Sequence, residues 1–217
     1  MPTYSLVNYK MLAIALAKEE IFAKRGSMIC YTGKINFTRS YLAGGGVQSL
    51  AMREVTNEEL IVMRARGTGK VCYGYYGKYV TIILLRGEML YIETDSVLAY
   101  DSRLQTGTIF QGNQGGVQGI IKGVASGQGL FTTTFSGSGE VAIISQGDAI
   151  ALEVTQKEPI FVDPNAYLGH KGMLTTQLVT DVNWKTLIGQ TSGESYQFKF
   201  TGQGTVYIQA YEREINP

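Results

Sequence analysis

The chain has 217 residues, of which 44% are hydrophobic and 17% charged, so it is long enough to bury a sizeable core. Its formal net charge of +1 gives no global field that would draw it to nucleic acid or to a membrane surface. No apolar run approaches the ~18 residues of a transmembrane helix, and the first residues lack the pattern of a signal peptide, so we expect a cytoplasmic location.

The first segment, residues 1–78, reads as strands joined by turns. A strand is expected at Met11–Leu16, and one short helix at Val47–Arg53, after three glycines. Residues 61–66 alternate in the period of a half-buried strand. That strand leads into a glycine pair and a valine, in the pattern x-Gly-x-Gly-x-Val.

The same signature recurs twice further along the chain. Strand-like segments at Val80–Leu85 and Ala149–Val154 match Met11–Leu16, and Phe22 corresponds to Tyr91 and Ile160 at steps of 69 residues. Self-similarity at a fixed period indicates one structural unit used several times. The glycine pairs of the three copies are Gly67 and Gly69, Gly137 and Gly139, and Gly202 and Gly204.

These repeats predict an all-β protein of three pseudo-equivalent β-units that form one compact globule. The units span residues 1–78, 79–147 and 148–217. Because no unit closes a core alone, we expect the three to pack around a pseudo-threefold axis. Each Gly-x-Gly is expected to form a tight hairpin or a bulge, where positive φ favours glycine.

The apolar positions of the repeat give a predicted core. Cys30 and Cys72 are expected in that core and not in a disulfide framework. The only histidine, His170, is expected in a turn at the surface. The side chains predicted to be buried are Phe131, Phe135, Val141, Phe198, Phe200 and Val206.

Charge is distributed unevenly along the chain. Residues 10–78 carry eleven Lys or Arg against five Asp or Glu, residues 79–147 three against five, and residues 148–217 five against eight. The first unit is therefore basic, which predicts a patch that binds an anion or an acidic partner, unless these charges are merely solvated. The candidate binding residues are Arg53, Arg64, Arg66 and Lys70.

RNA binding is an alternative use of this basic patch. It would combine basic side chains with aromatic platforms for the bases, which Tyr73, Tyr75 and Tyr76 would have to supply. Because the other two units carry a net negative charge and sheet packing explains the same tyrosines, binding to nucleic acid is not expected.

The sequence offers little chemistry for an enzyme. Metal sites of β-helix enzymes need two or three histidines with a carboxylate, and a nucleophilic triad would need His170 as its base. The glycine-rich stretches lack the spacing of a phosphate-binding loop. We therefore expect no catalytic residue, no metal and no cofactor. A hydrolase using scattered carboxylates is the remaining alternative.

The chain resembles the altered-inheritance-of-mitochondria (Aim twenty-four) family of mitochondrial biogenesis. The resemblance rests on the three Gly-x-Gly-x-Val signatures, on Gly129-Leu130-Phe131 and on the Gly26-Ser27-Met28 corner, and it extends from about Met11 to Tyr211. It implies a short double-stranded β-helix arrangement like that of the trp RNA-binding attenuation protein. It carries over no catalytic residue.

The function expected from these observations is a non-enzymatic binding or scaffold protein that works through protein–protein contacts. Three β-units leave strand edges with which other chains can pair, and the basic first unit beside two acidic ones favours head-to-tail contact. We therefore expect self-association or contact with another protein.

Overall fold

The computed structural model describes residues 1–41, 61–110, 131–180 and 196–210. Within these residues the regular structure is β-strand, apart from one three-residue 3-10 turn, η1 (Thr94–Ser96). The all-β prediction is therefore confirmed. The helix expected at Val47–Arg53 lies outside the described residues.

The first segment is built around one central strand. Strand β4 lies between β3 and β2 and pairs antiparallel with both, while β1 pairs with β2. The bounds are β1 (Thr3–Asn8), β2 (Met11–Lys24), β3 (Met28–Tyr41) and β4 (Ile61–Tyr73).

The third segment repeats this arrangement. Strand β14 takes the place of β4, β13 that of β3, and β11 and β12 together that of β2. The bounds are β11 (Ala149–Val154), β12 (Ile160–Val162), β13 (Tyr167–Thr180) and β14 (Tyr196–Gln209).

In the second segment each of these three strands is broken in two. One half of each gives the order β5-β10-β7, and the other halves give β6-β9-β8. Each half belongs to a different seven-stranded sheet. The bounds are β5 (Tyr79–Arg86), β6 (Leu90–Glu93), β7 (Val97–Asp101), β8 (Gln105–Phe110), β9 (Phe131–Ser136) and β10 (Ser138–Ser145).

The three segments share one strand register. Ile14 lies opposite Val71, and Ile83 lies opposite Val141. Leu152 lies opposite Val206 in the same way. We call residues equivalent when they hold the same place in this register. One expected correspondence is wrong by a residue, because the position of Phe22 and Tyr91 is held in the third segment by Phe161, not Ile160.

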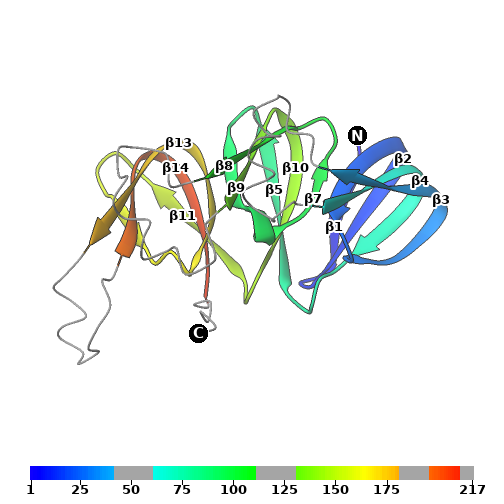
Figure 1. The fold of residues 1–217 in the computed structure, drawn as a ribbon, viewed down its shortest axis with the longest axis horizontal. Helices are drawn as coiled ribbons and strands as arrows, with labels where there is room; N and C mark the ends of the chain where they lie inside the picture. Colours follow the sequence, from blue (N-terminus) through cyan, green and yellow to red (C-terminus); the bar gives the residue numbers. More distant parts are fainter. Residues whose placement is uncertain (42–60, 111–130, 181–195, 211–217) are drawn as a thin grey trace.

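The expected pseudo-threefold axis is not confirmed. Figure 1 shows the three segments in a row along the long axis of the molecule. Strand β2 pairs with β7, and β6 pairs with β13, so the first segment joins the second and the second joins the third. Among the described strands, none of the first segment pairs with one of the third. The boundaries of the units stay a prediction.

The glycine pairs do not form hairpins, so the hairpin half of the expectation is wrong, but a bulge does occur at the first pair. Strand β4 runs through Gly67 and Gly69, and the bulge lies on its partner β2, where the register shifts between Ala17 and Glu19. A Cβ on Gly69 would lie 2.0 Å from the Thr32 carbonyl oxygen of β3. Glycine is needed because the neighbouring backbone comes so close.

The apolar faces of the strands form three buried clusters along the row. The core prediction is confirmed for Phe135, Val141, Phe198, Phe200 and Val206, which are all buried. The side chain of Phe131 lies outside the described part of the structure.

Candidate functional site

A strip of basic side chains runs over one face of the first segment. Arg64, Arg66 and Lys70 are separated by even numbers of residues on β4, so they lie on the same face. Lys34 on β3 joins them because it lies opposite Thr68 of that face. We call Lys34, Arg64, Arg66 and Lys70 the basic strip. The fourth predicted residue, Arg53, lies outside the described residues.

The basic strip has little neutralising charge. Arg64 is half-buried, and its Nε lies 3.6 Å from Glu20 Oε2 on β2. Lys34, Arg66 and Lys70 are exposed and form no ion pair with any carboxylate of the described residues. These three ammonium and guanidinium groups are therefore free to meet an anionic partner.

The repeat itself does not require these cations. The positions equivalent to Arg66 are Ser136 and Thr201, and those equivalent to Lys70 are Glu140 and Thr205. The same strand geometry thus forms with neutral or acidic side chains. The strip is a property of the first segment alone.

The aromatic residues of the RNA hypothesis do not lie on this strip. Tyr73 is buried in the first core cluster, on the opposite face of β4. Tyr75 and Tyr76 follow the end of β4, where their rings meet edge to face at 4.5 Å and Lys24 Nζ lies over the Tyr75 ring. Tyr73, Tyr75 and Tyr76 therefore offer no stacking platform between the cations of the basic strip.

The two cysteines lie at the surface, not in the core as expected. Cys30 is exposed and Cys72 half-buried, and both are free thiols. They are directly opposite each other on β3 and β4. Partial burial, and then the neighbouring Cys30, raise the pKa of the Cys72 thiol, so it is a poor nucleophile at neutral pH. The apolar sequence around Cys30 hid this, because β3 is an edge strand and residues 29–34 are all exposed.

His170 is buried in strand β13, which corrects the expected surface turn. Its Nδ1 shares a 2.6 Å hydrogen bond with the Tyr167 hydroxyl, and its ring stacks on Tyr91 at 4.5 Å. Burial lowers the pKa of His170 to about 4, so the imidazole is neutral at physiological pH. It packs against the rings of Tyr91, Tyr167 and Phe200, where the second and third segments meet.

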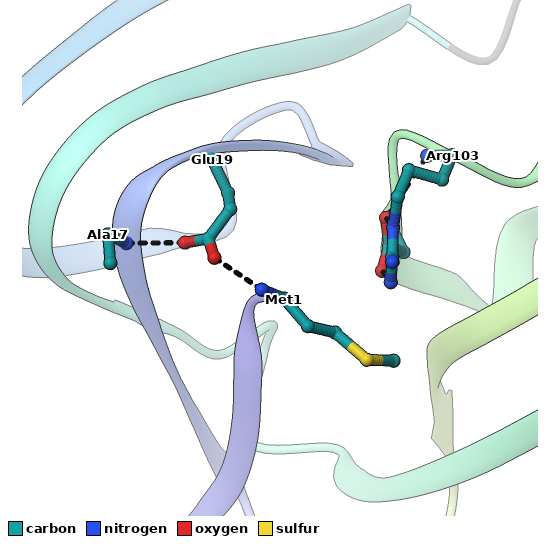
Figure 2. Close-up of polar contacts among 5 residues, drawn as sticks. Met1, Ala17, Glu19 and Arg103 are labelled. Atoms are coloured by element: carbon teal, nitrogen blue, oxygen red, sulfur yellow. Dashed lines mark hydrogen bonds and ion pairs between the residues drawn. The ribbon is translucent and has the colours of Figure 1, made fainter.

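A polar cluster that the sequence did not reveal lies where β2 meets the second segment. The Met1 amine donates to Glu19 Oε1 at 2.5 Å, and the Ala17 backbone N–H donates to the other Glu19 oxygen (Figure 2). These two hydrogen bonds lower the pKa of Glu19. Nearby, Arg103 donates to both carboxylate oxygens of the buried Asp101, at 2.9 and 2.5 Å.

The carboxylates of this cluster are already held by cations and backbone donors. An ionised carboxylate fixed in this way is a weak acid or base for catalysis. The only sequence signal was the spacing of Asp101 and Arg103, two residues apart. The hydrogen bonds of this cluster lie within the first segment, among Met1, Ala17 and Glu19, and within the second, between Asp101 and Arg103. The hydrogen bond and charge of Asp101 raise the pKa of Arg103, and across the two segments the negative charge of Glu19 adds to this effect.

The described part of the chain contains neither a cluster of metal-ligating side chains nor a helix that could span a membrane. No group of three or more His, Cys, Asp or Glu side chains in it comes close enough to hold a metal ion. None of the described residues forms a helix with the length and apolar character needed to cross a bilayer.

Comparisons with known proteins agree on family and fold. The family model described as mitochondrial biogenesis AIM24 matches residues 4–211. The X-ray structure of a Streptococcus pyogenes protein, solved by a structural genomics consortium, is similar with a TM-score of 0.70 and 20% sequence identity. The similarity covers 98% of this chain and 94% of that one. None of the curated proteins compared with the chain matches it.

Proposed function

The chain belongs to the mitochondrial biogenesis AIM24 family, and from this premise we propose that it is a non-enzymatic scaffold whose basic strip binds an acidic segment of a partner protein. The family description names a biological process and no reaction. The cytoplasmic location expected from the sequence stays a prediction.

One observation carries this proposal: three exposed cations lie on one open strand face, and none of them forms an ion pair with a carboxylate of the described residues. Complementary charge steers association and selects partners more than it adds raw affinity. The strip runs along two paired strands, and this suits an extended acidic peptide. It does not suit a buried small molecule, which requires a concave site.

The non-enzymatic part of the proposal is supported by how the reactive side chains are held. His170 is enclosed by aromatic rings, Asp101 is bound by Arg103, and the Cys72 thiol has a raised pKa. The hydrolase alternative would need two carboxylates free to exchange protons across an open site. Elemental analysis of the purified protein and a panel of ester and glycoside substrates test this part, and stoichiometric metal or turnover would contradict it.

The binding part is tested with a fluorescent polyglutamate peptide and fluorescence anisotropy. We expect binding that weakens as salt is added, because exposed charges are screened. Reversal of two strip charges in K34E/R66E should weaken binding by about tenfold or more. An RNA oligonucleotide of equal charge serves as the competing ligand. If the RNA bound more tightly than the peptide, the natural partner would be a nucleic acid and the proposal of a protein partner would be wrong.

The chain offers a matched control in its third segment. Met173 and Thr201 hold the positions equivalent to Lys34 and Arg66. The variant M173E/T201E therefore adds the same two side chains at the same register, away from the strip. It should leave peptide binding unchanged. K34E/R66E changes the net charge by −4 (two changes from +1 to −1) and M173E/T201E by −2 (two changes from 0 to −1). A loss of binding free energy in the control about half that of K34E/R66E would therefore show that overall charge, not the strip, governs binding.

A further inference from the structure

The two junctions between segments are built in the same way. At the first, β2 pairs with β7 through Ile21–Asp101, Phe22–Tyr100 and Ala23–Ala99. At the second, β6 pairs with β13 through the three equivalent pairs, which are Leu90–Lys171, Tyr91–His170 and Ile92–Gly169. Each segment thus joins the next through one fixed register.

An aromatic pair marks the centre of each junction. Phe22 stacks on Tyr100 with ring centroids 5.4 Å apart, and Tyr91 stacks on His170 at 4.5 Å. Directly opposite residues on paired strands contribute most of the side-chain contact between them. Phe22 and Tyr91 each come from one segment, and their partners Tyr100 and His170 come from the next segment along the chain.

The same two positions are open at the ends of the row. Phe161, equivalent to Phe22 and Tyr91, is 51% exposed on β12, whose only described partner strand is β14. Tyr31, equivalent to Tyr100 and His170, is 49% exposed on β3, whose only described partner strand is β4. Figure 1 places β3 and the third segment at opposite ends of the molecule.

The residues beside Tyr31 repeat this contrast. Ile29 is 56% exposed, whereas its equivalents Leu98 and Leu168 are fully buried at the two junctions. Cys30 is exposed, whereas its equivalents are buried. Three consecutive positions that junctions bury are therefore uncovered in the first segment. The buried equivalents of Cys30 are Ala99 and Gly169.

The open edge of β3 has a small residue, Cys30, beside Tyr31, as both junctions do beside the equivalent ring. Phe37, also on β3, meets the Tyr31 ring edge to face at 5.1 Å, so Tyr31 is supported from within its own segment. In the junction register Cys30 would lie opposite Val162, where the internal junctions place Ala99 and Gly169 opposite Ala23 and Ile92. A small residue thus stands at this place in all three segments, which leaves room for a neighbouring strand.

We propose that a second copy of this chain occupies each open edge, so that β12 of one copy pairs with β3 of the next and Phe161 stacks on the second copy's Tyr31. Such a contact is heterologous and joins copies head to tail, into a ring or a filament. It rests on the proposed scaffold function for its purpose, but it uses a different surface from the basic strip.

Light scattering coupled to size exclusion tests the proposed contact between β12 and β3 of two copies. The measurement is made at high salt, so that exposed charges are screened. The wild-type mass should rise with concentration to multiples of one chain. Y31E and F161E should each remain single chains, because a charge buried in an apolar joint is costly. M173E, which alters a residue 83% exposed outside the joint, should assemble like wild type.

Mixing the two variants distinguishes head-to-tail assembly from other contacts. Y31E keeps a native β12 edge and F161E keeps a native β3 edge. Together they should form a two-chain particle that grows no further. A wild-type protein that stays a single chain at its highest soluble concentration would overturn the proposal. So would an F161E variant that still self-associates, since β3 would then pair with itself.

A disulfide cross-link tests the register. In a C72S background, the thiol introduced by V162C should pair with Cys30 of the next copy when oxidised glutathione accepts the two electrons and two protons. A further change, C30S, should abolish the cross-link. A cysteine at Phe161 should cross-link poorly, because neighbouring residues of a strand face opposite sides. Equal cross-linking from both positions would contradict the register.

Peptide binding by the basic strip should persist in all these variants, so the two proposals can fail separately.

Discussion

The two internal junctions share a register but differ in chemistry. The first places Phe22, Tyr100 and Phe135 in contact, with Tyr100 in the middle. The second places Tyr91, His170 and Phe200 in the equivalent positions. The middle ring is thus the phenol of Tyr100 at the first junction and the imidazole of His170 at the second, and both are buried. The repeat fixes where an aromatic ring must stand, while the ring's chemistry is free to vary.

The largest expected effect comes from the inner phenylalanine of the second junction. Phe200 is fully buried and packs against both His170 and Tyr167. F200A should lower the free energy of unfolding by about 3–5 kcal/mol, because it removes a buried ring and leaves a cavity. Urea unfolding followed by fluorescence measures this loss.

F135A makes the same truncation at the first junction. It should cost a similar amount, since Phe135 is equally buried. A loss below about 1 kcal/mol in F200A alone would show that the third segment relaxes around the gap and that the junctions differ in packing as well as in chemistry.

The second prediction concerns acid and the histidine of the second junction, which has no counterpart at the first. The pKa of His170 is about 4 in the folded chain, because of burial, and the ordinary value is 6.5. The unfolded chain therefore binds more protons between these two values, so stability is present above pH 6.5 and falls as the pH drops toward 4. The expected loss is about 3 kcal/mol by pH 4.

H170Y tests this assignment because it gives the second junction the residue found at the first. Unfolding measured by urea at a series of pH values should lose most of its slope between pH 6.5 and 4 in this variant. H170Q provides a second uncharged replacement if the larger tyrosine does not fit. An unchanged slope in both would place the acid sensitivity on other groups.

The sequence predicted the repeat and its core well, because equivalent positions such as Val141 and Val206 keep their apolar character in every copy. It missed His170, since a histidine beside Gly169 and Lys171 looks like a turn and only the neighbouring segment buries it. It also misplaced Cys30, which lies at a junction position that the first segment leaves open. Local pattern predicts which face of a strand is apolar, but not whether another segment covers it.

The glycine pairs teach the same lesson at the level of the backbone. The sequence predicted that glycine is needed at positions 67 and 69. In the structure Gly67 and Gly69 lie inside one strand, β4, and not in a turn between two strands. Positive φ and close approach of a neighbouring backbone both select glycine, so the residue type alone does not separate a hairpin from a bent strand.

The smallest expected effect separates the backbones of the two junctions. Gly169 stands where the first junction has Ala99, and a Cβ on Gly169 would lie 2.3 Å from both the Tyr91 carbonyl oxygen and Ile92 Cδ1. G169A should therefore destabilise the protein by about 1–3 kcal/mol through overpacking. A99G, the reverse change at the first junction, should cost only about 1 kcal/mol through backbone entropy. Urea unfolding of both variants at neutral pH measures the difference. If G169A matched A99G or were neutral, the strands of the second junction would have room to separate, and its tight stacking of Tyr91 on His170 would not depend on a small residue beside it.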